Sequence, residues 1–316
     1  MAVLDAMRGF AAVAVAMVHF TIGLKPTWFQ SVSHWGWLGV DVFFVISGFI
    51  IPHALMRGGY LFPVDYPRFL AKRIIRLHPP YLAAVVLLMI VAKTPATPLQ
   101  AWIPHTFFSH LFLLNGLLGE PWLTQVFWSL AIEMQFYLFM GVAAPLLTGS
   151  RVKMALAVIG FLVVALVPVP KIWLTPHLPL FTFGILAFLK TCSKISLGIF
   201  LTGIAFSGVV CAHSLGRPQA LAGAATALLI CHSNWPVPSH LVKLGAVSYS
   251  LYLLHPLVGE VMLPLLDAQH RASVAGQMLV VGISMAISIG AAWIWFRLLE
   301  HPSQRLSASI RYAKRN

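Results

Sequence analysis

Long apolar runs separated by short polar segments make up most of this chain. A helix that spans a bilayer needs about 20 predominantly apolar residues. Because several runs are shorter than this, we expect some of them to tilt, break or re-enter the membrane. The pattern predicts an all-α, polytopic membrane protein. Its eleven apolar runs fall near residues 4–24, 37–56, 80–93, 102–118, 123–147, 153–168, 177–190, 196–214, 219–233, 243–264 and 274–298.

The composition agrees with a membrane protein. Of the 316 residues, 59% are hydrophobic and 9% are charged, whereas a soluble domain has about 25% charged residues. We expect residues 1–316 to form a single membrane domain, because no polar stretch is long enough for a separate soluble one. The net charge of +13 does not indicate a nucleic-acid partner, since basic residues of membrane proteins collect in cytoplasmic loops.

The distribution of the 21 basic residues predicts ten membrane spans. If all eleven runs cross the membrane, the basic tail after Arg297 lies outside and the charge bias weakens. The positive-inside rule therefore favours ten spans, with both termini in the cytoplasm and a re-entrant or interfacial segment at 102–118. In this topology the basic residues on the outer side are only Lys25, Lys93, Lys171, Arg217 and Arg271.

The first apolar run carries ionisable side chains on one helical face. Arg8 and His19 are eleven residues apart, almost three helical turns, which puts them on one stripe about 16 Å apart. Asp5 precedes Arg8 by one turn and is placed to pair with it. One interpretation makes His19 a general base, because imidazole titrates near working pH. The alternative is a hydrogen bond to a neighbouring helix, but the shared stripe with Arg8 favours a functional role.

A second polar face lies in the run 123–147. Ser129, Glu133 and Tyr137 are spaced four residues apart and share one side of a helix. A buried carboxylate can orient and stabilise a catalytic histidine. We therefore predict that Glu133 orients His19, with Ser129 and Tyr137 contacting the substrate. The alternative is structural hydrogen bonding between spans.

Four cations form a basic face just before the third run. Arg68, Lys72 and Arg76 follow each other at four-residue spacing, with Arg73 beside them. Several cations on one helical face suit a polyphosphate ligand. The prolines at 79–80 are expected to end this helix. The alternative is topological, because positive charge also holds a segment inside or binds anionic lipid.

The segment 39–49 is interpreted mainly as architectural. Gly48 permits close approach of two helices, and Ser47 can form a hydrogen bond across them. Asp41, near the predicted outer interface, is a candidate substrate contact.

The segment 245–256 contains a further polar stripe. Ser248, Tyr252 and His255 lie on one side of the expected helix. The stripe is suited to hydrogen-bond a sugar, with Tyr252 and His255 as candidate substrate contacts, or to join two helices. No zinc-type HxxxH spacing occurs, and no metal is expected.

Together these segments resemble the acyltransferase-3 family of integral membrane acyltransferases. Each motif is weak alone, but their order along nearly the whole chain makes the resemblance specific. The matching elements are Leu4-Asp5 with Arg8-Gly9 and His19, Phe43-Phe44 with Ser47-Gly48-Phe49, the basic run from Phe69 to Tyr81, Trp128-Ser129-Leu130 with Glu133 and Phe136-Tyr137, Ser248 to His255, and Glu300 with Pro302.

The resemblance implies about ten transmembrane helices and transfer of an acyl group, usually acetyl, from cytosolic acyl-CoA to a hydroxyl. The family's essential arginine and histidine correspond to Arg8 and His19. Lys72 stands where the family often has arginine. We expect no SGNH-type domain of the kind that some relatives carry after the last span. It is therefore most similar in character to the bacterial exopolysaccharide O-acetyltransferases of the succinoglycan type, in the inner membrane.

These observations predict an acyl-CoA-dependent O-acyltransferase acting on an exopolysaccharide or lipid-linked saccharide. His19 removes the proton of the hydroxyl, or in a variant carries the acetyl group itself. The catalytic residues are expected to be His19, Glu133, Arg8 and Asp5, and the phosphates of acetyl-CoA are expected to bind Arg68, Lys72, Arg73 and Arg76.

Three alternatives are left open, one of which is a purely structural subunit of a polysaccharide export complex. A transporter or flippase for a lipid-linked sugar would also carry intramembrane charges, and a small glycosylated or macrolide acceptor would use the same chemistry. The expected partners are acyl-CoA, the saccharide acceptor and membrane lipid, and a homodimer is left open.

Overall fold

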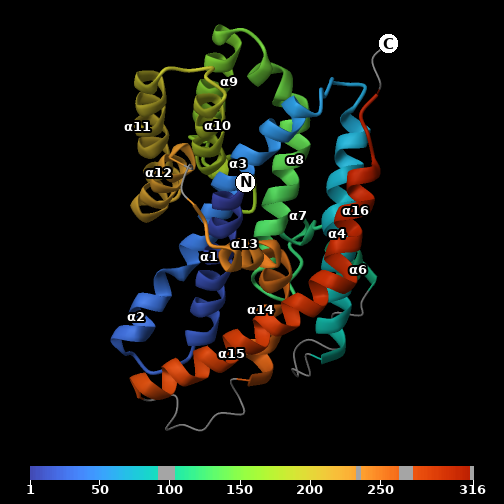
Figure 1. Cartoon of the computed structure of the whole chain (residues 1–316), viewed down its shortest axis with the longest axis vertical. Helices are drawn as coiled ribbons and strands as arrows, with labels where there is room; N and C mark the ends of the chain where they lie inside the picture. Colours follow the sequence, from blue (N-terminus) through green and yellow to red (C-terminus); the bar gives the residue numbers. More distant parts are fainter. Residues whose placement is uncertain (92–103, 233–235, 263–272, 314–316) are drawn as a thin grey trace. The chain divides into compact units, whose positions relative to one another are not determined.

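The computed structural model describes residues 1–91, 104–232, 236–262 and 273–313. Every regular element in these ranges is a helix, as the sequence predicts (Figure 1). The ends of four predicted apolar runs, at 92–93, 102–103, 233 and 263–264, lie outside the described residues.

Within the described residues, six helical stretches are long and apolar enough to cross a membrane, or seven if a bent pair counts as one span. Three other helices, of 14 or 15 residues, measure only about 21–23 Å against a hydrocarbon core of about 30 Å. The ten-span topology therefore stays a prediction. The six stretches are Ala2–Thr21, Trp28–Arg57, Tyr66–Ile90, Phe127–Thr148, Leu197–Ser214 and Val274–Ser309, and the bent pair is Ser239–Ala246 with Ser248–Met262.

The segment predicted to be re-entrant contains two short helices, α6 (Pro104–Leu111) and α7 (Asn115–Leu118). Leu113, with a φ of 58°, takes the left-handed conformation between them. Neither helix is long enough to cross a bilayer, and the re-entrant or interfacial placement of this segment stays a prediction.

Two boundaries differ from those predicted. Helix α4 (Tyr66–Val91) continues through the prolines at 79–80, so the prediction that they end the helix is wrong. Each proline removes one backbone donor, and membrane helices tolerate this because neighbouring groups satisfy the freed carbonyls. The carbonyls freed here are those of Ile75 and Arg76, four residues before each proline. The run 243–264 is bent by 66° between α13 (Ser239–Ala246) and α14 (Ser248–Met262).

The chain divides into two compact units, each assembled from three separate stretches. Neither unit is a contiguous sequence domain, and the single domain stays a prediction. Unit 1 comprises residues 1–40, 76–129 and 237–305, and unit 2 comprises residues 41–75, 130–236 and 306–316.

Unit 1 is built around α1 (Ala2–Thr21), which packs against α13, α14, α15 (Val274–Trp295) and α2 (Trp28–His34). The closest approach is between α1 and α13, where a Cβ on Gly245 would collide with the carbonyl oxygen of Asp5. After α15 the helix continues as a π-helical turn, η4 (Phe296–Glu300), and then as α16 (His301–Ser309).

Unit 2 is built around α10 (Leu178–Thr191), in which every residue from Leu178 to Leu189 is buried. A helix that is apolar on all sides belongs in a protein interior, and here α9 (Arg151–Val164), α11 (Leu197–Ser214) and α12 (Arg217–Cys231) pack against it (Figure 1). Helix α3 (Gly39–Arg57) also meets α10, because a Cβ on Gly48 would collide with the carbonyl oxygen of Phe181. The predicted role of Gly48 in close helix packing is confirmed.

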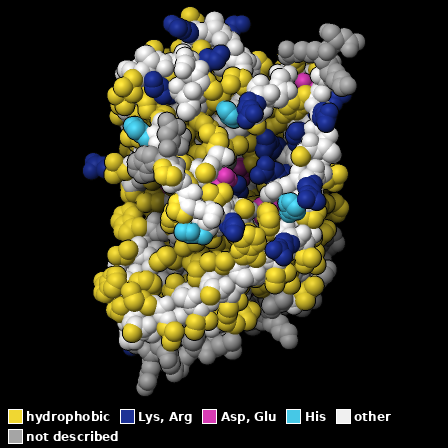
Figure 2. All heavy atoms as spheres, in the orientation of Figure 1, with side chains coloured by type: hydrophobic (Ala, Val, Ile, Leu, Met, Phe, Trp, Pro, Cys, Tyr) yellow, Lys and Arg dark blue, Asp and Glu magenta, His cyan; other side chains and the backbone are white. Residues whose placement is uncertain are grey.

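Large apolar side chains remain exposed on the outside. Leu221, Val209 and Leu298 are 72%, 70% and 67% exposed, and hydrophobic side chains are spread over the face in Figure 2. Such a surface suits lipid, since a soluble protein rarely exposes large apolar patches.

Candidate active site

In unit 1, His19 lies near the end of α1 and contacts a second histidine on α14. Its Nδ1 is 2.8 Å from the carbonyl oxygen of Val15 and 3.2 Å from Nε2 of His255. The two rings meet edge-on, with centroids 4.9 Å apart. Because a carbonyl oxygen only accepts hydrogen bonds, Nδ1 of His19 is the protonated nitrogen. In the neutral ring, Nε2 is then bare and available as a base.

Two of the predicted substrate contacts join helices in the same unit. The hydroxyl of Tyr252 donates to Val126 O at 2.9 Å and lies 2.6 Å from the hydroxyl of Ser129. Tyr252 is 5% exposed and His255 is fully buried. These contacts favour the helix-joining alternative for the stripe on α14.

Glu300, at the end of the π-helical turn, forms a third polar group of unit 1. Its carboxylate accepts hydrogen bonds from the hydroxyl of Ser250 at 2.5 Å, the amide of Ser250 at 3.2 Å and the side chain of Gln304 at 2.9 Å. The positive charges of Arg8 and Arg76 also act on this carboxylate. A buried acid under the influence of two arginines is thus anchored at a π-helical turn. Such turns are frequent at functional sites.

Asp5 lies 3.6 Å from the terminal amine of Met1, in a half-exposed ion pair. Its predicted pairing with Arg8 stays a prediction.

In unit 2, Glu133 on α8 (Phe127–Thr148) accepts two short hydrogen bonds. The hydroxyl of Ser47 donates to Oε1 at 2.6 Å and that of Tyr137 donates to the same oxygen at 2.5 Å. Ser47 thus bonds across helices, as predicted. A carboxylate that orients a histidine normally binds its Nδ1–H, but Nδ1 of His19 already has two partners in its own unit. The orienting role of Glu133 stays a prediction.

Arg73 is 9% exposed and lies over two aromatic rings of unit 2. Its guanidinium carbon is 5.4 Å from the ring centre of Phe69 and 5.6 Å from that of Tyr137. These are cation–π distances. Through the contact with Tyr137, which donates to Glu133, the basic face of α4 is connected to that carboxylate.

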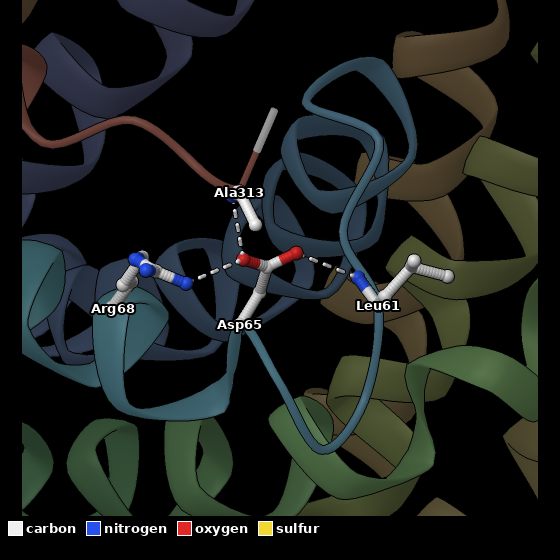
Figure 3. Close-up of polar contacts among 4 residues, drawn as sticks. All are labelled: Leu61, Asp65, Arg68 and Ala313. Carbon is white, nitrogen blue, oxygen red and sulfur yellow. Dashed lines mark hydrogen bonds and ion pairs between the residues drawn. The ribbon is translucent and has the colours of Figure 1, made fainter. Parts of the chain in front are cut away.

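Arg68 forms an ion pair at the start of α4. Its Nη1 lies 3.3 Å from Oδ1 of Asp65, while the amides of Leu61 and Ala313 donate to the same carboxylate at 3.1 and 2.9 Å (Figure 3). Asp65 is 2% exposed, and the Arg68 side chain is 46% exposed. A buried acid therefore positions the most exposed end of the basic face.

Lys72 is bound by the C-terminal segment of the same unit. Its ammonium donates to Ile310 O at 2.9 Å and lies 5.3 Å from the ring centre of Tyr312. Tyr60 packs against Tyr312, with ring centres 5.6 Å apart. Burial raises the pKa of Tyr60 to about 12, so its hydroxyl stays protonated and donates to Gly141 O at 2.6 Å. The polar end of α4 is thus enclosed by segments far away in the sequence.

Asp41, the remaining candidate, is 6% exposed in the first turn of α3. Its Oδ2 atom is buried and has no hydrogen-bond partner among the described residues, while the positive charge of Lys171 acts on it. Its predicted contact with substrate stays a prediction.

Sequence reasoning gave no role to Glu300 or Asp65. A signal for Glu300 exists, since it lies two residues after the last apolar run in a chain with only eight acids. Asp65 lies in a loop-like stretch, and no pattern connects it with Ala313, 248 residues later.

Comparison with known proteins decides the family. The sequence profile of the acyltransferase-3 family, described as an acyltransferase domain, matches residues 1–297. The chain belongs to this family. The resemblance drawn from its motifs is confirmed, and the protein is an acyltransferase-family membrane protein.

Three relatives carry acetyltransferase names. A putative acetyltransferase, ORF330, of Acidianus two-tailed virus is 26% identical over 290 residues, covering 81% of this chain and 82% of the relative. The O-acetyltransferase OatA of Staphylococcus aureus is 33% identical over 149 residues, 43% of this chain and 23% of the relative. The putative peptidoglycan O-acetyltransferase YrhL of Bacillus subtilis is 31% identical over 180 residues, 51% of this chain and 26% of the relative.

The matched part of this chain thus spans only about a quarter of OatA or YrhL. None of the three names refers to succinoglycan. No solved structure matches the chain.

Proposed function

We propose that this protein is a membrane O-acetyltransferase that moves an acetyl or other short acyl group from cytosolic acyl-CoA to a saccharide hydroxyl. The observation that carries the proposal is the environment of His19. Within an acyltransferase family chain, this histidine has its Nδ1 engaged by Val15 O and its Nε2 bare. Such a ring is prepared to accept a proton.

In the proposed reaction, Nε2 of His19 takes the proton of the acceptor hydroxyl as its oxygen attacks the thioester carbonyl. The tetrahedral intermediate collapses, the C–S bond breaks, and the CoA thiolate receives the proton from His19. In the variant with an acetyl-histidine, Nε2 attacks the thioester first and the hydroxyl then removes the acetyl group. Both routes require the same bare nitrogen.

The donor site is proposed to lie on the basic face of α4. Arg68 is the most exposed contributor, and Lys72 and Arg73 follow it along the helix. Guanidinium groups bind phosphate oxygens through paired hydrogen bonds, so the three phosphates of CoA match this face better than a single anion does. The positive charge of Arg76 acts on the carboxylate of Glu300 in unit 1. Arg76 also continues the four-residue spacing of the basic face, and we assign Arg76 to the donor site for this reason.

The acceptor is proposed to be a saccharide at the membrane. The relatives' names point to O-acetylation, one of them on peptidoglycan. Peptidoglycan fragments and exopolysaccharide oligosaccharides are therefore both suitable test acceptors. The protein is proposed to lie in a bacterial inner membrane, with both termini cytoplasmic.

The test uses purified protein in nanodiscs with radiolabelled acetyl-CoA and either acceptor. We expect label transfer by the wild type and a loss of about 10²–10⁴ in turnover for His19→Ala, the usual contribution of a general base. His213→Ala is the matched control, because this exposed histidine lies on α11 in unit 2. Wild-type turnover in His19→Ala would refute the assignment. Absence of acetyl-CoA binding in the wild type would favour the transporter alternative instead.

A further inference from the structure

The second histidine of the pair, His255, has its own ring geometry fixed by the backbone of α14. Its Nδ1 lies 3.1 Å from the carbonyl oxygen of Leu251. A carbonyl oxygen cannot donate, so this nitrogen carries the hydrogen. In the neutral ring, Nε2 of His255 is therefore an acceptor.

This acceptor faces the protonated nitrogen of His19. The Nδ1–H of His19 is shared between Val15 O at 2.8 Å and His255 Nε2 at 3.2 Å. If both rings took the other tautomer, the Nδ1 atom of each histidine would lose its hydrogen. A bare nitrogen would then lie 2.8 Å from Val15 O and another 3.1 Å from Leu251 O, and both hydrogen bonds to the backbone would be lost. The neighbouring groups therefore select one arrangement.

We infer that His255 is a positioning residue that, together with Val15 O, holds His19 as the Nδ1–H tautomer, with Nε2 as its reacting atom. His255 is fully buried, which suits contact with His19 better than contact with a sugar. Its ring is enclosed by Tyr252 and Phe20, with ring centres 5.7 and 6.3 Å away. The catalytic meaning of this inference rests on the proposed function, whereas the tautomer itself does not.

The test compares His255→Phe, which keeps a ring but has no acceptor, with His255→Gln, whose side-chain oxygen can accept. We expect kcat to fall about tenfold or more in His255→Phe, since a wrong tautomer costs up to about 10⁴ in a known triad. The KM for acetyl-CoA should stay unchanged, and His255→Gln should recover most of kcat.

Solid-state ¹⁵N NMR of ring-labelled histidine gives a readout that needs no turnover. Signals of His19 are identified by their absence from His19→Gln. We expect a protonated Nδ1 and a bare Nε2 in the wild type, and a larger share of the Nε2–H tautomer in His255→Phe, in which Val15 O is the only remaining acceptor of the pair. An unchanged ¹⁵N pattern and unchanged kcat in His255→Phe would overturn the inference. A wild-type protein with the expected pattern but no acetyl transfer would instead refute the proposed function alone.

A second, independent observation concerns a groove in unit 2 between α9, α10 and α11. Its volume is about 1050 Å³, at the upper end of the range for ligand pockets. Most of its lining is apolar, including Met154, Val158, Leu162, Leu189 and Phe206.

One end of this groove is cationic. Arg151, Lys190 and Lys194 line it there, and none of them forms an ion pair within the described ranges. The sequence has no Asp or Glu between residues 134 and 259. Helices α9 and α11 also begin at this end, with Ser150 and Ser196 as their N-caps, and helix N-termini favour anions.

We propose that this groove binds an anionic phospholipid, with its acyl chains along the apolar lining and its phosphate at the three cations. Purified protein is titrated with phosphatidylglycerol, phosphatidylcholine or inorganic phosphate while its Tm is followed by tryptophan fluorescence. We expect phosphatidylglycerol alone to raise Tm, and the triple variant Arg151→Gln, Lys190→Gln, Lys194→Gln to lose this shift.

Lys153→Gln is the matched control, because Lys153 lies on α9 beside Arg151 but outside the groove lining. This variant should respond to phosphatidylglycerol as the wild type does. Equal stabilisation by phosphatidylcholine would show that the groove binds acyl chains without regard to the charge of the headgroup. Stabilisation by inorganic phosphate would show that the three cations bind a free anion. Either result would overturn the proposal.

Discussion

A single oxygen of Glu133 accepts hydrogen bonds from two hydroxyl groups in unit 2. The distances of 2.6 and 2.5 Å from Ser47 and Tyr137 are those of charge-assisted bonds, which are roughly twice as strong as neutral ones. Two roles are compatible with this geometry. The carboxylate either supplies charge to the reaction or holds α3 and α8 together.

Substitution of Glu133 separates these roles. Glu133→Ala leaves two largely buried hydroxyls without their acceptor, at about 1–3 kcal/mol each, and should lower Tm. Glu133→Gln keeps an acceptor oxygen and should keep Tm close to that of the wild type. If the charge is catalytic, as the sequence predicts, Glu133→Gln loses acetyl transfer although it stays folded. Full activity in folded Glu133→Gln would assign a structural role.

At this scale, the sequence identified the type and spacing of residues but not their partners. Arg8, His19 and Glu133 were recognisable because ionisable groups are rare in apolar runs. The pairing of His19 with His255 was not, because it joins residues 236 positions apart and depends on how α1 packs against α14. Helical periodicity reports only which face a residue occupies.

Between elements, the contact of α3 with α10 depends on glycine on both sides. A Cβ on Gly48 would meet the carbonyl of Phe181, and a Cβ on Gly184 would meet the carbonyl of Val45. Backbone atoms cannot move aside as the end of a flexible side chain can. The two helices would therefore have to separate.

Gly48→Ala should destabilise the protein by about 3 kcal/mol or more, the upper range for overpacking a core. Gly208→Ala is the control, since this glycine lies within α11 with no atom near its potential Cβ, and alanine favours helix by about 1 kcal/mol. Size-exclusion chromatography and Tm in detergent should show loss of folded protein only for Gly48→Ala. Equal Tm values for the two variants would contradict the close packing.

Helix positions were predictable from the apolar runs, but their ends and bends were not. The prolines at 79–80 read as a helix end because proline lacks a backbone donor. In a membrane helix the alternative of leaving the backbone unfolded in lipid is worse, so α4 continues. The bend before α14 follows from packing of α13 on α1, which a hydropathy pattern does not contain.

For the whole molecule, the charge distribution predicts that the C-terminal segment is cytoplasmic. In a variant lacking Cys192, Cys211 and Cys231, a cysteine at Ser309 should stay unlabelled by a membrane-impermeant maleimide in intact cells and react after permeabilisation. Ser309 is exposed, so burial does not protect it. Labelling from outside in intact cells would contradict the ten-span topology.

The class of the molecule was the most predictable property, since 59% hydrophobic residues in long runs leave few alternatives to a helical membrane protein. The number of spans was less predictable. Helices of 14 or 15 residues, such as α9 and α10, are too short to be counted from length alone, and α10 is covered by protein on all sides. Hydropathy does not distinguish protein surroundings from lipid.

The carboxylate in Figure 3 has a consequence for the order in which the chain is made. Leu61 and Arg68 emerge from the ribosome with Asp65, but Ala313 follows 248 residues later. At about 5–20 residues per second, this delay is roughly 12 to 50 s. During that interval the start of α4 lacks one of its partners, and Lys72 lacks Ile310. The nascent protein therefore completes the contacts of its basic helix only after residue 313 has been made, and chains stalled before that point would expose this helix end to proteases of the cell.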